Sequence, residues 1–223
     1  MAALVRPSRH QCDVLTPLQA EVWRVIGRLG KDHGFALAGG AALIAYGIID
    51  RPTSDLDVVG PSGVTVEAFV EQVERELQSL SFRTERITDY PQLVRMRIHR
   101  DDEELGIDIG VDCRSLAPVA TRYGLLLDEL DVAGGKVDAF VNRREPRDLD
   151  DLIALEARHG LETLCRLAAE KDPTFRPGEL DMALKGIESD PTFDVDPAVI
   201  ARWRSEIPLL GPVREESGFE IDF

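Results

Sequence analysis

Apolar residues recur every three or four positions in two segments of the first half of the chain, residues 18–33 and residues 66–80. Thr16 and Gln19 are spaced to form a capping box at the start of the first segment. Gly34 follows that segment and suits the left-handed conformation that ends a helix. These signals predict two amphipathic helices, each with one face toward a core.

Shorter apolar or alternating runs predict five strands, each bounded by turn residues. They cover residues 35–38, 55–59, 82–87, 93–99 and 105–111. The first run stops at Gly39-Gly40, and the small residues 41–47 after it predict a short, packed helix. The acidic turn 101–104 is expected to join the last two strands as a hairpin.

From about residue 116 onward the apolar pattern is helical. The helices that it predicts cover residues 128–142, 148–158, 161–170, 177–187 and 197–207. The chain is therefore expected to have an α+β fold, with a mixed-sheet domain over residues 1–115 and a helical C-terminal part over residues 116–223.

The 223 residues include 41 acidic and 26 basic side chains, which gives a formal net charge of −15. Because nonspecific nucleic-acid binding comes mostly from neutralised phosphates, this charge argues against a broad nucleic-acid surface but allows a local basic site. The three cysteines have neither disulfide nor zinc-ligand spacing, which favours a reducing cytoplasm. The N-terminus lacks a signal-peptide core, and no apolar run is long enough to span a membrane, so we expect no membrane partner.

Two aspartates, Asp55 and Asp57, lie on the strand predicted over residues 55–59. Alternate strand residues face the same side, so the two carboxylates are expected a few ångströms apart. Two like charges this close favour a hard divalent cation between them, and Mg²⁺ or Mn²⁺ accepts such oxygen ligands. Asp108 interrupts the apolar run of a neighbouring strand and is the favoured third ligand, with Asp112 as the alternative on the same face.

The Gly39-Gly40 turn supplies a complementary feature. A strand that ends in two glycines and opens into a helix presents backbone N–H groups to an anion, with no side chain in the way. In-line displacement at a phosphoryl centre needs charge neutralisation on the attacking and leaving oxygens, which metal ions supply. A phosphate site beside a metal site indicates nucleotidyl transfer.

The order of these motifs resembles a known superfamily. Gly39-Gly40, then Arg51-Pro-Thr-Ser-Asp-Leu-Asp57, then the apolar-flanked Asp108, is similar to the nucleotidyltransferase fold of the DNA polymerase β superfamily. Gly135-Lys136 on one helix and Arg147-Asp148-Leu-Asp-Asp151 opening the next resemble the AbiEii/AbiGii group of nucleotidyltransferase-like toxins. The resemblance covers residues 35 to about 158.

The resemblance implies that Asp55 and Asp57 bind metal, that Lys136 contacts the nucleotide phosphates, and that either Asp148 or Asp151 is also functional. Without it, Lys136 is interpreted as an exposed helix lysine that balances Asp138. The expected catalytic residues are Asp55, Asp57, Asp108, Lys136 and Asp148, and the expected nucleotide-binding residues are Gly39, Gly40, Ser54, Lys136, Arg147 and Asp151. Many superfamily members have serine at the second glycine, so Ser54 or Thr53 is expected to supply the missing hydroxyl.

The function implied is metal-dependent transfer of a nucleotide from a nucleoside triphosphate to an acceptor hydroxyl, with release of pyrophosphate. By resemblance the acceptor is RNA, especially a tRNA 3′ end, and the protein is the toxin of a toxin–antitoxin pair with a separate antitoxin. An RNA acceptor would need a local basic patch, for which the candidates are Arg143, Arg144, Arg147, Arg158 and Arg166.

Two alternative functions stay open. In the first, the acceptor hydroxyl belongs to a protein or to a cationic aminoglycoside, and either acceptor suits an acidic surface better than RNA does. In the other, the chain is a catalytically silent module that binds a nucleotide or a partner, which the absence of serine after Gly39 favours.

Overall fold

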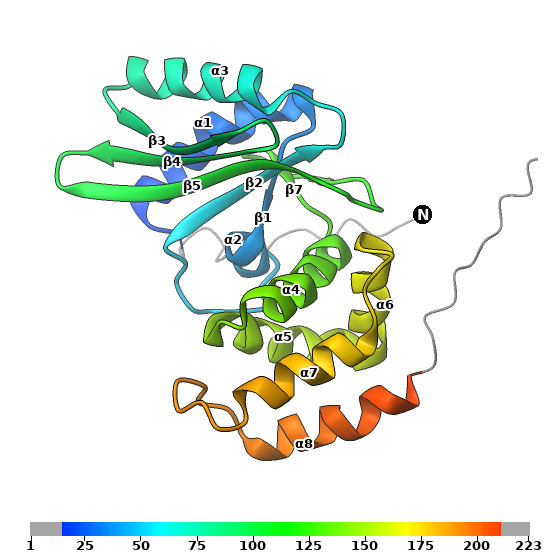
Figure 1. The fold of residues 1–223 in the computed structure, drawn as a ribbon. Helices are drawn as coiled ribbons and strands as arrows, with labels where there is room; N and C mark the ends of the chain where they lie inside the picture. Colours follow the sequence, from blue (N-terminus) through cyan, green and yellow to red (C-terminus); the bar gives the residue numbers. More distant parts are fainter. Residues whose placement is uncertain (1–14, 211–223) are drawn as a thin grey trace, which may run out of the picture. The chain divides into compact units, whose positions relative to one another are not determined.

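The computed structural model describes residues 15–210 (Figure 1). Its contacts divide the chain into two compact units, with the boundary between Gly135 and Lys136 inside helix α4 (Glu129–Arg143). The contact units divide the chain at a later residue than the domain boundary expected after residue 115. That boundary stays a prediction.

A seven-stranded sheet of order β3-β4-β5-β2-β1-β7-β6 forms the centre of the first unit. The strands are β1 (Ala36–Ala38), β2 (Asp55–Pro61), β3 (Arg83–Tyr90), β4 (Leu93–Arg100), β5 (Glu103–Asp112), β6 (Val119–Ala120) and β7 (Leu125–Leu126). β2 pairs parallel with β5 and antiparallel with β1. The sheet is therefore mixed, and the α+β prediction is confirmed.

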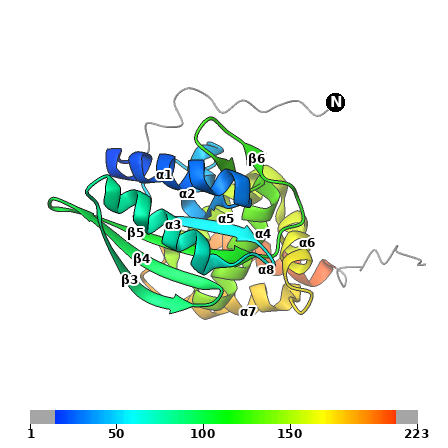
Figure 2. The same cartoon turned by 90° about the horizontal axis from the view of Figure 1, so that it is seen from above.

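Helices α1 (Pro17–Gly30) and α3 (Val66–Ser79) lie side by side across one face of this sheet (Figures 1 and 2). Their apolar sides cover alternate residues of the central strands, which are almost completely buried: Leu56, Val58, Met96, Ile98, Ile107 and Ile109. The short helix α2 (Gly39–Ala45) follows β1 directly and packs against β1 and β2.

The predicted signals at the ends of α1 are present. Gln19 N donates to Thr16 Oγ1, and Thr16 N donates to Gln19 Oε1, which completes the capping box. A short 3₁₀ turn (Lys31–His33) continues the helix to Gly34, whose φ of 74° is left-handed.

The helical expectation for the stretch after residue 116 is wrong for β6 and β7. Leu125 and Leu126 pair alongside β1, and Leu127 N donates to Leu37 O at 2.9 Å. The turn between the two strands packs against α1 at Gly27, where an added Cβ would lie 2.0 Å from the Tyr123 carbonyl oxygen. Close backbone packing and strand pairing therefore override local helical preference here.

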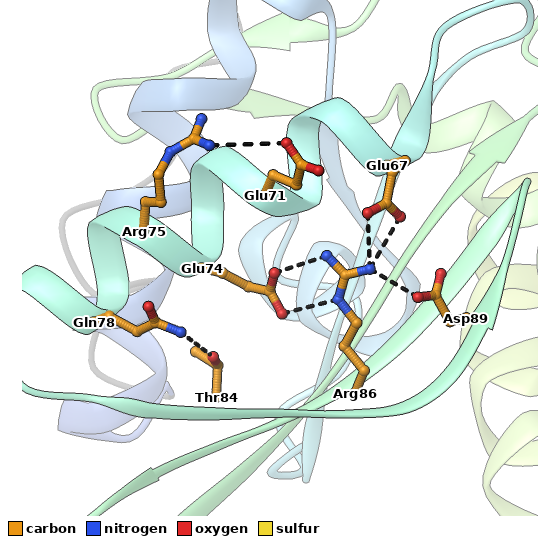
Figure 3. A network of polar contacts seen from close by, with 8 residues as sticks. All are labelled: Glu67, Glu71, Glu74, Arg75, Gln78, Thr84, Arg86 and Asp89. Carbon is orange, nitrogen blue, oxygen red and sulfur yellow. Dashed lines mark hydrogen bonds and ion pairs between the residues drawn. The ribbon is translucent and has the colours of Figure 1, made fainter.

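An arginine on the edge strand β3 joins this strand to α3 (Figure 3). Arg86 donates to Glu74 at 2.7 Å and to Glu67 at 2.9 Å, both on α3, and to Asp89 at 2.8 Å. Hydrogen bonds, chiefly those with Glu74, raise the pKa of Arg86, so the guanidinium stays charged. The network fixes the edge of the sheet under its covering helix.

The second unit is helical, as predicted. It holds the end of α4 and four further helices, α5 (Pro146–His159), α6 (Leu161–Lys171), α7 (Pro177–Ile187) and α8 (Pro197–Glu206), followed by a 3₁₀ turn (Ile207–Leu209). Phe140 and Trp203 are fully buried in this unit.

Two further observations concern the described part of the chain. None of its helices has both the length and the hydropathy needed to cross a bilayer. Cys113 and Cys165 form no disulfide in this part of the chain, and Cys12 lies outside the described residues.

Candidate functional site

Asp55 and Asp57 lie on one face of β2, as their spacing predicts. Along β2 half-buried and buried residues alternate, so both aspartates are half-buried and face away from the apolar side of the strand. Asp57 is in register with Asp108 on the parallel strand β5, and Asp55 is in register with Gly106. Asp112 pairs with Pro61, four residues further along. The register therefore favours Asp108 as the third carboxylate.

The carboxylate of Asp57 packs directly over the first glycine of the predicted turn. An added Cβ on Gly39 would lie 1.7 Å from Asp57 Oδ2, and Gly39 has a φ of 60°. An added Cβ on Gly40 would lie 3.3 Å from Thr53 Oγ1 and 3.9 Å from Arg51 Nη2. The glycine turn is thus bordered by an acid, a hydroxyl and a guanidinium.

We expect Gly39→Ala to destabilise the first unit by about 2 kcal/mol or more, because alanine is strained at positive φ and would collide with Asp57. Urea unfolding followed by circular dichroism measures the loss. Gly63→Ala, at a φ of 88° with open space around it, provides the control for the conformational part alone. Equal losses in the two variants would mean that Asp57 does not press on Gly39.

A hydroxyl also holds the first carboxylate of β2. Thr53 Oγ1 donates to Asp55 Oδ1 at 3.1 Å, and the Thr53 carbonyl accepts from Gln19 Nε2 at 2.7 Å. Gln19 is buried, so α1 fixes the loop that leads into β2. Ser54, the other expected hydroxyl, is exposed at the end of this loop.

Asp108 forms an ion pair with Arg95 that the sequence motifs do not predict. Arg95 Nε on β4 donates to Asp108 Oδ2 at 2.9 Å. The antiparallel register of β4 and β5 places these two residues opposite each other. The signal for this contact was present in the predicted hairpin, because a turn over residues 101–104 fixes which residues of the two strands face each other.

In this structure the carboxylates do not converge. Among residues 15–210 no group of three or more His, Cys, Asp or Glu side chains is close enough to hold a metal ion. Asp108 is turned to Arg95, and Asp57 packs on Gly39. The donor chemistry of Asp55 and Asp57 nevertheless fits a hard divalent cation, since both offer carboxylate oxygens on one half-exposed face.

The second unit contains a buried charge cluster around Lys136. Lys136 is only 7% exposed, which excludes the alternative of an exposed lysine balancing Asp138. Its Nζ lies 2.7 Å from Asp151 Oδ2 and 3.5 Å from Asp148 Oδ1, and both aspartates are 0% exposed. Arg143 donates to both carboxylate oxygens of Asp148, at 2.6 and 2.8 Å. The cluster therefore balances two buried carboxylates with two cations.

Cations hold Asp148 in its charged form. Burial alone would raise its pKa, but the hydrogen bonds from Arg143 and the charges of Lys136, Arg143 and Arg147 outweigh burial, so the pKa of Asp148 is lowered. A carboxyl whose folded pKa is depressed contributes stability above its unfolded pKa and loses it as pH falls through the folded value.

We expect Asp148→Asn to lower the free energy of unfolding at pH 7 by about 3 kcal/mol, because it removes one partner of a buried ion pair. The wild-type advantage should shrink as pH falls below about 4, where the unfolded carboxyl takes up protons. Urea unfolding at pH 7 and at pH 3 measures both effects. An Asp148→Asn protein as stable as wild type at pH 7 would contradict the assignment.

The arginines proposed as a basic patch are mostly engaged with acids. Arg143 binds Asp148, Arg147 Nε donates to Glu145 at 2.7 Å, and Arg166 pairs with Glu170 one helical turn away. Their positive charge is thus locally compensated, which weakens this patch as an RNA-binding surface.

A comparison with models of protein families identifies the family of this chain. The family model of the nucleotidyl transferase AbiEii toxin, of type IV toxin–antitoxin systems, matches residues 22–221. The chain belongs to the AbiEii family. As a member of this family of toxins it is a nucleotidyltransferase, and the resemblance inferred from its motifs is confirmed. A search of curated proteins found no match.

Two solved structures support the fold of this AbiEii family member, and a third is similar to it at a lower score. JHP933 from Helicobacter pylori is 18% identical with a TM-score of 0.53, and the match covers 92% of this chain and 93% of that one. A candidate nucleotidyltransferase from H. pylori is 20% identical with a TM-score of 0.50, over 91% of this chain and 95% of that one. A CCA-adding enzyme solved with ATP is 17% identical with a TM-score of 0.46, over 94% of this chain and 56% of that one.

Proposed function

We propose that this nucleotidyltransferase is metal-dependent and that it moves a nucleotide from a nucleoside triphosphate to a hydroxyl of RNA, with a tRNA 3′ end as the acceptor. The observation that carries the proposal is the register of β2 and β5, which sets Asp57 beside Asp108 with Asp55 on the same face. The Gly39-Gly40 turn borders this face at Asp57.

In this proposal Asp55 and Asp57 hold Mg²⁺ or Mn²⁺, which neutralises charge on the attacking and leaving oxygens when bound. Backbone N–H groups of Gly39 and Gly40 bind the triphosphate. Asp108 accepts the proton of the acceptor hydroxyl or becomes a further metal ligand, and for either role it has to exchange its bond with Arg95.

Lys136 is proposed to contact the triphosphate, because a nucleoside triphosphate with one Mg²⁺ still carries about two negative charges. Asp151 and Asp148, both fully buried against Lys136, then act as positioning residues that orient its ammonium group. The nucleotide-binding roles of Ser54 and Arg147 stay predictions.

We also propose a separate antitoxin as a partner and the cytoplasm as the location. The family description supports the first, and the absence of a disulfide pattern in the sequence supports the second. Growth arrest on expression, relieved by a neighbouring gene product, would test the toxin role.

The experiment that tests the proposed reaction is incubation of the protein with each labelled nucleoside triphosphate, Mg²⁺ and one acceptor class at a time. Label in tRNA supports the proposal. Label in total protein or in an aminoglycoside would replace the acceptor, and binding of nucleotide without any transfer would support a silent module. Omission of divalent metal should remove the label, and transfer without metal would contradict the metal site.

A further inference from the structure

Around Asp55, Asp57 and Asp108, one face of the sheet in the first unit carries mainly charged residues and glycine. On β4, Arg95 and Arg97 alternate with buried Val94, Met96 and Ile98. Alternate strand residues share a face, and the register pairs Arg95 with Asp108 and Arg97 with Gly106. The two arginines therefore share the face of the candidate carboxylates, opposite to the face that α1 and α3 cover.

Gly106 occupies the centre of this face, and packing within the first unit does not explain it. The nearest atom to an added Cβ would be Asp55 Cβ at 3.7 Å, an ordinary van der Waals contact. Gly110 differs, because an added Cβ there would lie 3.2 Å from the Gln92 carbonyl oxygen. A strand-interior glycine is unfavourable by roughly 0.5–1 kcal/mol relative to alanine, and such a glycine often marks the close approach of a ligand.

The order of the strands indicates from which side of the sheet an acceptor would reach Gly106. β1 and its glycine turn lie on one side of β2, whereas β5 and then β4 lie on the other. In an in-line displacement the attacking and leaving oxygens lie on opposite sides of the reacting phosphorus. With the triphosphate on the β1 side, the β5 side is the one that we assign to the acceptor hydroxyl.

We propose that the acceptor is a polynucleotide whose 3′ end crosses β4 and β5, with its last nucleotide over Gly106 and its phosphates on Arg95 and Arg97. This inference rests on the proposed function and assigns the acceptor side of the same site. The guanidinium groups of both arginines are accessible, since the side chains are 54% and 52% exposed.

The ion pairs that these arginines form do not prevent phosphate binding. Arg97 Nη1 lies 3.2 Å from Glu104 Oε1, and Arg95 Nε lies 2.9 Å from Asp108 Oδ2. Half-exposed ion pairs of this kind contribute only about 0–1 kcal/mol to the stability of the fold. A phosphate can therefore replace either carboxylate. Both arginines lie on the face of the candidate carboxylates, so they can meet the phosphates of an acceptor there although the net charge of the chain is −15.

The test compares Arg97→Ala with Arg75→Ala in transfer assays that titrate tRNA and nucleoside triphosphate separately. Arg75 is the matched control, since it is an exposed arginine of the same unit that pairs with Glu71 one turn away on α3. We expect Arg97→Ala to raise the KM for tRNA about tenfold at low salt, to weaken its salt dependence, and to leave the KM for the nucleotide unchanged. Arg75→Ala should change neither constant.

Gly106 is tested by Gly106→Ala and Gly106→Val, with Gly178→Ala as a control glycine that has nothing within 4 Å. Gly106→Ala should melt at the wild-type temperature or above, and Gly106→Val should raise the KM for tRNA more than Gly106→Ala does. A lower melting temperature for Gly106→Ala would mean that glycine is required for packing.

The outcomes separate this inference from the proposed function. If wild type labels tRNA but the Arg97 and Gly106 variants alter only the KM for the nucleotide, or neither constant, the acceptor path is wrong and the reaction stands. If wild type labels protein and not RNA, the polynucleotide acceptor is wrong. If wild type transfers no nucleotide at all, the proposed function itself fails.

Discussion

Asp57→Asn is expected to abolish nucleotide transfer, with a loss of about a thousandfold or more, while the protein keeps its fold. The amide keeps the shape that packs over Gly39 but removes one of the charges that a divalent cation requires. Because the substitution also relieves repulsion from Asp55 and Asp108, the melting temperature without metal should be unchanged or higher. A transfer assay and circular dichroism melts measure the two effects.

A control for this prediction lies in the second unit. Asp194-Val-Asp196 is a second DxD pair, in a loop, and Asp196 caps α8 through a 2.9 Å hydrogen bond from Ala198 N. Asp194 is exposed, so Asp194→Asn should retain full activity. Appreciable turnover by Asp57→Asn would remove Asp57 from the metal site. Activity that survives Asp108→Ala but not Asp112→Ala would show that the third carboxylate is Asp112.

Lys136→Ala should weaken nucleotide binding and slow transfer, by about a hundredfold in kcat/KM, with little change in affinity for the acceptor. Its ammonium is the cation that we assign to the triphosphate, and lysine acts there as a point charge. Lys136→Arg should be only partly tolerated, because Lys136 is buried against two fully buried aspartates and the guanidinium of arginine is wider than an ammonium group. Separate titrations of nucleotide and acceptor test this, with Lys185→Ala on α7 as an exposed control.

Stability is a second readout for Lys136, since its removal leaves two buried carboxylates with less positive charge. We expect Lys136→Ala to lower the free energy of unfolding by about 3 kcal/mol. A double variant that combines Lys136→Ala with Asp151→Ala should be more stable than Lys136→Ala alone but should recover none of the activity. Recovery of activity in the double variant would show that Lys136 acts only in the fold, and a loss confined to acceptor affinity would remove it from the nucleotide site.

Local signals were enough to predict most of the fold. The capping box at Thr16 starts α1, the left-handed Gly34 ends the 3₁₀ turn that continues it, and the alternation along β2 placed Asp55 and Asp57 on one face. Each of these features depends on residues close together in the sequence, so no distant contact is needed to see them. Two-residue strands such as β6 have no period to detect, and their pairing with neighbours comes from tertiary packing.

The candidate site was only partly predictable for the same reason. The spacing of Asp148 and Asp151, three residues apart on one helix, indicates a shared face, but the helix that it meets cannot be read from spacing. Burial of Lys136 against them is a contact between two helices. The bond between Arg95 and Asp108 depends on strand register, which the sequence constrains only through the hairpin turn.

Glutamine and glutamate serve equally well at the third position of a capping box, yet in this chain they are not equivalent. The Gln19 amide accepts from Thr16 N through its oxygen and donates to the Thr53 carbonyl through its nitrogen. A glutamate would still complete the capping box, but its second carboxylate oxygen would face the Thr53 carbonyl oxygen. Two hydrogen-bond acceptors would then face each other at a buried position, with no donor between them. A substitution that helix statistics treat as silent would thereby loosen the chain just ahead of Asp55.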